Sequence, residues 1–346
     1  MARALCTGGW LPAGAQYGPS VPVAETIALA TVGCLRGHGR GCERGLRRPE
    51  FWAIFVRFGS AVRPLARAVG TADGGGSMRT RLHDWLDTML AAPGVRSLRE
   101  RRFDDEFRSG HRGNSCRGLY ASYSEAQSAA PRTLPLGYDN EAAASMYRDR
   151  LERIYPGDYP VLHWLGEWFR DGARRVFDLG GHVGVGYYAY QNYLRYPSGL
   201  QWQLFDMPAV LESARELARE RDRLGALTFA ARVEDAAGAD VLFSSGCLQY
   251  REDTLAELLS RLESRPRRVL VNLIPLHDRH EFWTVQSIGT AFCPYRIQLR
   301  SKFFADLEKA GYRVLDRWEN AEKRCEVAFE PGHSFTGYTG AALELR

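Results

Sequence analysis

The sequence predicts an α/β fold, doubly wound around a mostly parallel sheet of seven strands. From residue 174 onward, short apolar runs alternate with amphipathic helical stretches, a pattern typical of parallel strands joined by crossover helices. The strand candidates are apolar almost throughout, as strands buried on both faces are. No helix separates the last two candidates, so we expect them to pair as a hairpin that adds an antiparallel edge.

The predicted elements follow one another in a regular order. Strands are expected at 174–180, 200–208, 226–231, 239–246, 267–276, 312–320 and 339–346. Amphipathic helices are expected between them, at 182–196, 209–224, 251–265 and 301–311. The insert 279–300 separates the fifth strand from its helix, and we interpret it as a lid or a substrate-binding element.

Composition and pattern divide the chain into three parts. Residues 1–77 are rich in glycine and arginine, and we interpret them as a disordered extension or as a stretch that precedes the biological start at Met78. Residues 78–172 predict a helical preface, in which Ser122 or Ser124 can cap one helix and Asp139 or Asn140 the next. Residues 173–346 form the predicted α/β domain.

Charge and cysteine usage narrow the class of protein. The formal net charge of +5 is spread along the chain, so no basic patch indicates a nucleic-acid partner. The seven cysteines never form a CxxC pair, which predicts neither a disulfide framework nor a zinc site and favours a reducing cytoplasm. No apolar run approaches the roughly 18 residues of a membrane span, so we expect no stable membrane insertion.

The stretch "VFDLGGHVG" at 176–184 predicts where a ligand binds. Ligands lie at the carboxyl ends of the strands in a parallel sheet, and Asp178 with its glycine cluster ends the first predicted strand. Glycines let the backbone approach a ligand closely. Asp206 ends the next strand, where its carboxylate can accept both hydroxyls of a ribose.

Two kinds of nucleotide ligand compete for this turn. A dinucleotide would place its pyrophosphate on the turn and the helix start, but Asp178 would then face a doubly charged group at unfavourable Coulomb energy. The loose fingerprint "GVGYYA" at 184–189 also begins several residues after the strand ends. S-adenosyl-L-methionine has no phosphate, and its sulfonium and ammonium groups attract an aspartate. The residues favour S-adenosyl-L-methionine as the cofactor.

The same residues carry a resemblance to a known family. "VFDLGGHVG" resembles the DxGGGxG motif of class I S-adenosylmethionine (SAM)-dependent methyltransferases, with His182 in place of the middle glycine. "LFDMPAVLESA" resembles the FDLPxV segment of small-molecule O-methyltransferases. From Gly118 onward the chain is similar to bacterial methyltransferases of unassigned substrate, through "GLYASYSEAQSAAP", "LGYDN", "LVNLIPL", "IGTAFCPYRI" and "WEN".

The resemblance implies a Rossmann-like class I fold, methyltransferase activity (EC 2.1.1.-) and a set of cofactor-binding residues. In the resembling family the aspartate of the FDLP segment holds the ribose. Similar proteins are associated with surface-polysaccharide gene sets, which implies a small polar or glycan-linked acceptor. The implied cofactor-binding residues are Asp178, Gly180, Gly181, His182, Gly184, Asp206, Met207 and Tyr138.

Transfer to an oxygen acceptor calls for a base. The O-methyltransferases that the chain resembles have a histidine after the fourth strand, but Gln249 occupies that position here. Glutamine cannot take a proton, so we expect Gln249 and Tyr250 to orient the acceptor. His277, with Asp278, follows the fifth strand and is the best candidate for the base. His280 suggests half of a metal pair, but no further ligand is identifiable and no metal is expected.

The insert 279–300 supplies further candidate contacts to the acceptor, namely Trp283, Gln286 and Tyr295. Two alternative functions stay open. One is a non-catalytic partner protein with the SAM-binding fold, in which Gln249 marks lost chemistry. The other is an NAD(P)-dependent oxidoreductase, which Asp178 and the C-terminal hairpin disfavour.

Overall fold

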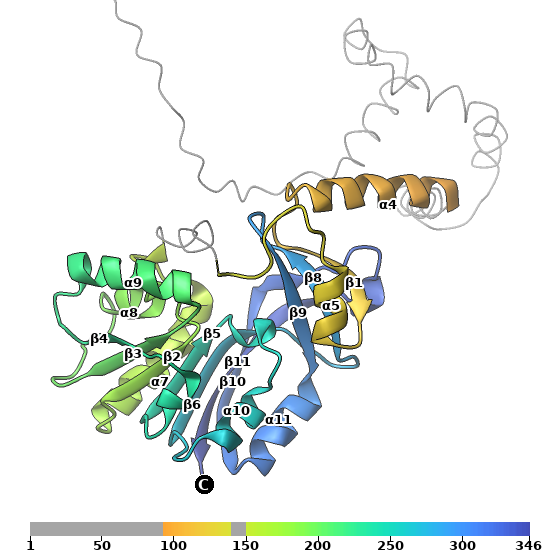
Figure 1. The fold of residues 1–346 in the computed structure, drawn as a ribbon. Helices are drawn as coiled ribbons and strands as arrows, with labels where there is room; N and C mark the ends of the chain where they lie inside the picture. The colour runs from red at the N-terminus through yellow and green to blue at the C-terminus, as the bar shows by residue number, and fades with distance from the viewer. Residues whose placement is uncertain (1–92, 140–149) are drawn as a thin grey trace, which may run out of the picture. The chain divides into compact units, whose positions relative to one another are not determined.

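The computed structural model describes residues 93–139 and 150–346. The predictions for residues 1–77, for a start at Met78 and for a helix at 141–147 lie outside the described residues. The described residues belong to one unit, Asp87–Arg346, in which helices flank a seven-stranded sheet and a second sheet of four strands lies beside it (Figure 1).

The larger sheet is mixed, which corrects the expectation of a mostly parallel sheet. Its strand order is β10-β11-β6-β5-β2-β3-β4. β2 pairs in parallel with β3 and β5, β3 with β4, and β5 with β6, whereas β11 is antiparallel to both β6 and β10. The strands are β2 (Arg175–Leu179), β3 (Gln201–Phe205), β4 (Leu227–Phe229), β5 (Val241–Ser245), β6 (Arg268–Ile274), β10 (Tyr312–Cys325) and β11 (Phe335–Leu345).

The strand order locates the ligand-binding edge. The run β4-β3-β2-β5-β6 follows the doubly wound order 3-2-1-4-5, so the order reverses between β2 and β5, and ligands of such sheets bind at that switch point. The predicted hairpin of the last two strands is confirmed. Its antiparallel strand, β11, is internal rather than at the edge. β10 therefore runs in the same direction as β2 to β6, and its carboxyl end lies at the ligand edge.

Helices cover both faces of the sheet and divide its core in two. α7 (Tyr159–Arg170), α8 (Val185–Tyr190) and α9 (Pro208–Arg221) pack on one face, and α10 (Leu255–Arg261) and α11 (Arg300–Lys309) on the other. Successive residues of a strand point to opposite faces, so Phe243 enters the first core and its neighbour Leu242 the second. Burial on both faces explains why the central strands β2, β5 and β6 are mostly apolar.

The insert after the fifth predicted strand forms a second sheet. β7 (Leu276–His277), β8 (Phe282–Ser287) and β9 (Phe292–Leu299) combine with β1 (Ser115–Tyr120) in the order β1-β8-β9-β7. β1 comes from the preface, so that segment is not purely helical as expected. Helix α5 packs across β8 and β9 (Figure 1).

The preface contains three of the described α-helices: α4 (Pro93–Arg108), α5 (Tyr123–Ala129) and α7. The predicted cap of α5 is confirmed, because Ser122 Oγ accepts the N–H of Glu125 at 3.2 Å. Short 3₁₀ turns are η3 (Pro156–Asp158), η4 (Val233–Ala236), η5 (Leu248–Tyr250) and η6 (Pro331–His333). Across 93–139 and 150–346, every helix is too short or too polar to cross a bilayer.

Candidate functional site

The glycine turn after β2 has a backbone that restricts which residues it accepts. Gly180 and Gly184 have φ of +73° and +90°, in the left-handed region that glycine enters without cost. His182 is also left-handed, with φ of +58°, which costs a residue with a Cβ atom about 1–2 kcal/mol. The strained residue occupies a position where the resembling motif has a glycine.

The turn also packs too tightly for side chains at two of its positions. A Cβ atom at Gly180 would lie 2.3 Å from Sγ of Cys247, which follows β5. A Cβ atom at Gly181 would lie 2.3 Å from Oδ2 of Asp178. The turn therefore rests directly on the ends of β2 and β5, which is the switch point of the sheet. Sequence reasoning missed Cys247, and only its place after a predicted strand hinted at a role.

Asp178 lies beneath this turn. Its side chain is 1% exposed, and its Oδ2 accepts a hydrogen bond from Nε1 of Trp202 at 2.9 Å. Its Oδ1 has no hydrogen-bond partner among the described residues. Burial raises the pKa of Asp178 to about 7, although the bond from Trp202 acts in the opposite direction. Asp178 is therefore packed against Gly181 and is not open to contact from outside.

Asp206 follows β3 and joins the turn to the neighbouring strand. The parallel register places β3 beside β2, and Gly180 N donates to Phe205 O at 2.7 Å. Asp206 Oδ2 then accepts His182 N at 2.8 Å, and Oδ1 accepts Met207 N at 2.7 Å. These two bonds use about half of the four acceptor positions of a carboxylate. Burial raises the pKa of Asp206.

Met207 extends this corner with an apolar surface, since 43% of it is exposed beside Asp206. Asp139 reaches the same corner from the preface, where its Oδ1 accepts Ala209 N at 2.9 Å at the start of α9. The charge of Asp139 also raises the pKa of Asp206. The sequence indicated Asp139 only as a possible helix cap.

Gln249 lies in the turn after β5, the third side of the site. It is 5% exposed, and its Nε2 donates to Gly246 O at 2.9 Å. Its Oε1 is buried and has no hydrogen-bond partner within the described part of the chain. Leaving a buried acceptor unsatisfied costs about 1–3 kcal/mol. A hydrogen-bond donor on a ligand would remove that cost.

A chain of polar groups links this turn to the preface and the second sheet. Tyr138 donates its hydroxyl to Tyr250 Oη at 3.2 Å, and the Tyr250 hydroxyl donates to Gln286 Oε1 at 2.7 Å. The Tyr250 ring meets Tyr138 and Tyr295 edge-on, with centroids 4.9 and 5.3 Å apart. The structure thus brings together four residues that the sequence indicated separately. Trp283, the other residue named from the insert, instead packs edge-on against Tyr123.

The segment before Tyr138 is fastened to the second sheet. Gly137 N donates to Phe292 O at 2.8 Å, and Phe292 N donates to Pro135 O at 2.9 Å. Tyr138 is therefore held between β9, which begins at Phe292, and the turn after β5. These contacts bring part of the preface to the ligand edge.

The structure does not place His277 as a base. Its Nδ1 accepts the N–H groups of Arg279 and His280, each at 3.0 Å, so the neutral ring carries its proton on Nε2. A further proton could bind only at the cost of those two bonds. Burial lowers the pKa of His277, and its ring packs against Phe335 with centroids 5.6 Å apart.

Asp278 does not accompany His277 as a catalytic partner. Its side chain is 75% exposed and pairs with Arg300 at 2.6 Å. The rings of His277, His280 and His333 lie in a row, with successive centroids 5.0 and 4.6 Å apart. Even so, no group of three His, Cys, Asp or Glu side chains in the described ranges is arranged to hold a metal ion.

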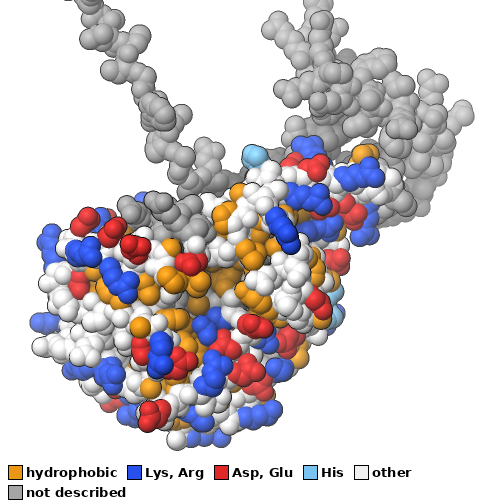
Figure 2. All heavy atoms as spheres, viewed as in Figure 1, with side chains coloured by type: hydrophobic (Ala, Val, Ile, Leu, Met, Phe, Trp, Pro, Cys, Tyr) orange, Lys and Arg blue, Asp and Glu red, His pale blue; other side chains and the backbone are white. Residues whose placement is uncertain are grey.

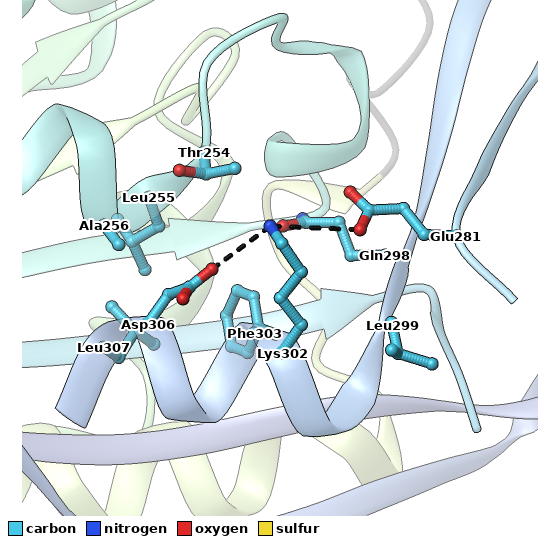
Figure 3. A pocket seen from close by; sticks show the side chains of 10 residues that line it. All are labelled: Thr254, Leu255, Ala256, Glu281, Gln298, Leu299, Lys302, Phe303, Asp306 and Leu307. Atoms are coloured by element: carbon cyan, nitrogen blue, oxygen red, sulfur yellow. Dashed lines mark ion pairs between the residues drawn. The ribbon is translucent and has the colours of Figure 1, made fainter. Parts of the chain in front are cut away.

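Two cavities in the described residues lie away from the glycine turn. The one in Figure 3, between α10, β9 and α11, has a volume of about 10 Å³ and is crossed by the ion pairs of Lys302 with Asp306 (3.2 Å) and Glu281 (3.9 Å). That space holds at most one water. A wider groove of about 600 Å³ lies between α11 and β10. Figure 2 shows hydrophobic side chains gathered instead in a hollow across the middle of the viewed face.

Comparison with known proteins finds similarity only among solved structures. No family model and no curated protein sequence matches the chain. One similar structure is the 1,6-didemethyltoxoflavin-N1-methyltransferase of Burkholderia thailandensis with S-adenosylhomocysteine bound, at 18% identity over 55% of this chain and 78% of that chain, with a TM-score of 0.36. Another is the mitomycin 7-O-methyltransferase MmcR, at 17% identity over 74% and 70%, with a TM-score of 0.38.

A third similar structure is the magnesium protoporphyrin IX methyltransferase of Synechocystis with S-adenosylhomocysteine bound. It is 14% identical over 60% of this chain and 96% of that chain, with a TM-score of 0.38. These figures describe partial similarities. The mixed seven-stranded sheet and the acidic glycine turn at its switch point are properties of this chain itself.

Proposed function

We propose that the chain is a SAM-dependent methyltransferase. The observation that carries the proposal is the acidic floor of the glycine turn, where Asp178 lies directly under Gly181 with one carboxylate oxygen unpartnered among the described residues. A cationic ligand above the turn offsets the cost of burying that charge, whereas a pyrophosphate increases it. The sulfonium and ammonium groups of S-adenosyl-L-methionine supply the cation.

Each residue at the corner has a role in this proposal. Asp206 accepts the ribose hydroxyls at the positions that His182 N and Met207 N leave open, and Met207 covers the adenine. The backbone of the turn, at Gly180 and Gly181, approaches the methionine part of the cofactor. The bound cofactor supplies an electrophilic methyl group.

Gln249 and Tyr250 orient the acceptor in this proposal. The buried Oε1 of Gln249 accepts a hydrogen bond from the N–H or O–H of the nucleophile, and Tyr138 and Gln286 hold the Tyr250 hydroxyl in place. Methyl transfer forms a bond from the nucleophile to carbon, breaks the sulfur–carbon bond and releases the proton to solvent. We propose a small polar acceptor, such as a glycan-linked hydroxyl group.

Titration of the purified protein with three ligands tests the cofactor. In isothermal titration calorimetry, we expect a heat of binding for S-adenosylmethionine and for S-adenosylhomocysteine, and none for NADH. Preferential binding of NADH would support the oxidoreductase alternative and end the methyltransferase proposal.

Replacing Asp206 tests the ribose contact. Hydrogen bonds to charged groups contribute roughly 1.5–3 kcal/mol, so Asp206→Asn should weaken S-adenosylhomocysteine binding by about tenfold to a hundredfold. The bonds from His182 N and Met207 N predict some loss of folding stability as well. Asp222→Asn is the matched control, because Asp222 accepts Leu227 N at 3.0 Å before β4, at the opposite edge of the sheet. An equal loss of affinity in both variants would contradict the ribose assignment.

The non-catalytic alternative has one observation in its favour. The turn after β5 presents an amide at Gln249, and Nδ1 of His277 accepts backbone N–H groups, so neither residue is placed as a base. A protein of this kind binds S-adenosylhomocysteine but transfers no methyl group. Incubation with methyl-labelled cofactor and a panel of hydroxyl and amine acceptors separates the two, because the alternative predicts no labelled product.

A further inference from the structure

Two buried thiols meet where the second sheet touches the edge of the larger one. Cys116 lies in β1 and Cys325 at the end of β10, with 2% and 3% of their surfaces exposed. Both belong to one hydrophobic cluster. The backbones are joined beside them, since Cys116 N donates to Glu326 O at 3.3 Å and Ala328 N donates to Cys116 O at 2.9 Å. Cys116 forms a parallel bridge with Val327, two residues after Cys325, and residues two apart on an extended segment point to the same face.

This pairing is selective among the described cysteines. Cys293 lies in a different cluster, with Ile288 and Ala291, and Cys247 packs under Gly180. The thiol pair adjoins two phenols as well. Tyr338 belongs to the same hydrophobic cluster, and its hydroxyl lies 2.9 Å from that of Tyr295.

We propose that Cys116 and Cys325 are a redox modification site, at which an oxidant converts the two thiols to an intramolecular disulfide. With glutathione disulfide, one protein thiolate attacks the disulfide and releases one glutathione thiolate. The second protein thiol then displaces the other glutathione, so that the sulfur–sulfur bond forms and two glutathione thiols leave. Hydrogen peroxide gives the same product by way of a sulfenic acid, with release of two waters.

The surroundings set the rate and the consequence of this reaction. The neighbouring Cys325 thiol, together with burial, raises the pKa of the Cys116 thiol, and only the thiolate attacks. Oxidation therefore proceeds slowly, through local opening of the contact between β1 and β10. Once formed, the bond closes the long loop from residue 116 to residue 325, and such closure disfavours the unfolded chain. It also locks β1 to the edge of the larger sheet.

Oxidation of the full-length protein, followed by peptide mapping, tests the proposed disulfide directly. Native protein is incubated with glutathione disulfide, alkylated and digested without reduction, and the peptides are identified by mass. We expect a peptide pair joined through Cys116 and Cys325 that disappears after dithiothreitol, together with a thermal midpoint several degrees above that of reduced protein. Absence of the joined pair, or its appearance only after unfolding, overturns the proposal.

Variants identify the partners without depending on the proposed methyl transfer. Cys116→Ser retains a hydrogen-bonding group of similar size and should abolish both the joined pair and the rise in the midpoint. Cys293→Ser, another buried cysteine, should retain both. A rise that persists in Cys116→Ser contradicts the proposal. If Cys116→Ser fails to fold, the peptide map of the wild type still decides. Titration of S-adenosylhomocysteine into reduced protein reports on the proposed function separately.

Discussion

The proposed cofactor corner (residues 178–184, Asp206 and Met207) and the proposed acceptor side (Tyr138, Gln249, Tyr250 and Gln286) are assembled from different kinds of contact. At the corner, a short turn from Gly180 to Gly184 packs on strand ends, and the carboxylate of Asp206 accepts two backbone N–H groups. On the acceptor side, side chains bond side chains across long separations, as in the bond between Tyr138 and Tyr250, which are 112 positions apart. Local backbone geometry builds the first region, and tertiary packing builds the second.

This difference predicts how each region responds to change. The corner tolerates almost no added volume, because a Cβ atom at either Gly180 or Gly181 meets an atom at 2.3 Å. The acceptor side depends on separate hydrogen bonds, each worth about 1 kcal/mol. A single substitution should therefore disable the corner, whereas the acceptor side should weaken by steps.

The largest effect is expected for Gly180→Ala. The added methyl group meets Cys247, and alanine resists a φ of +73°, so we expect a loss of about 3 kcal/mol in unfolding free energy and no measurable binding of S-adenosylhomocysteine. Gly199→Ala is the control, because Gly199 has a similar φ of +75° but a Cβ atom there would meet nothing within 4 Å. We expect Gly199→Ala to lower the unfolding free energy by about 1 kcal/mol. Equal losses in urea unfolding would contradict the packing argument.

An effect that depends on pH is expected for Asp178→Asn. The folded-state pKa of Asp178 is raised to about 7, so between about pH 4 and pH 7 the folded state binds the proton that the unfolded state has released. Proton binding at Asp178 therefore stabilises the folded state at low pH. This stabilisation is lost as the pH rises through that window, by up to about 1.4 kcal/mol per pH unit. The asparagine variant should lack this decline. Unfolding curves at a series of pH values measure it, and parallel profiles for the two proteins would refute it.

A double-mutant cycle tests the hydrogen bond between Tyr138 and Tyr250 on the acceptor side. Tyr138→Phe and Tyr250→Phe each remove a hydroxyl from one hydrogen bond, so their effects on unfolding free energy should couple by about 0.5–1 kcal/mol. Tyr193→Phe, at a tyrosine that is 52% exposed, should show no coupling with Tyr250→Phe. Additive losses for Tyr138 and Tyr250 would show that their hydroxyls do not bond in solution.

The smallest effect is expected for His182→Gly. Glycine relieves the left-handed strain at a φ of +58° but loses more entropy on folding, so the unfolding free energy should change by less than about 1 kcal/mol. S-adenosylhomocysteine should bind as well as before, because Asp206 bonds the backbone N–H of this residue. A tenfold loss of affinity in a calorimeter would instead show that the imidazole touches the ligand.

The same contrast explains what the sequence could predict. Asp178 and the glycines form a local motif, and the buried strands are apolar because both faces are covered, so the turn and most of the strand positions were predictable. β8 was not, because "FWTVQS" is buried at every position although half of its residues are polar. Its partner β1 comes from the preface. The sequences of β1 and β8 therefore carry no periodic pattern that shows that these two distant segments pair.

Orientation was also beyond the sequence. His277 follows β6 at the expected edge, but its ring turns toward the N–H groups of Arg279 and His280. Nothing in the letters "PLHDRH" distinguishes a ring that caps its own backbone from one that faces a ligand. The mixed character of the sheet had the same origin, because the expected hairpin did not specify which of its strands would meet β6.

The place of β11 between β6 and β10 has a consequence for the order of assembly. β10 reaches the sheet only through β11, and β11 pairs with β6 across a long stretch of chain, as in Ala341 with Val271. During synthesis, the side of β6 that faces β11 stays open until the later strand emerges. An unpaired strand edge can form hydrogen bonds with other chains. A nascent chain that stalls before Phe335 therefore exposes an aggregation-prone edge of β6, and β10 lacks its strand partner.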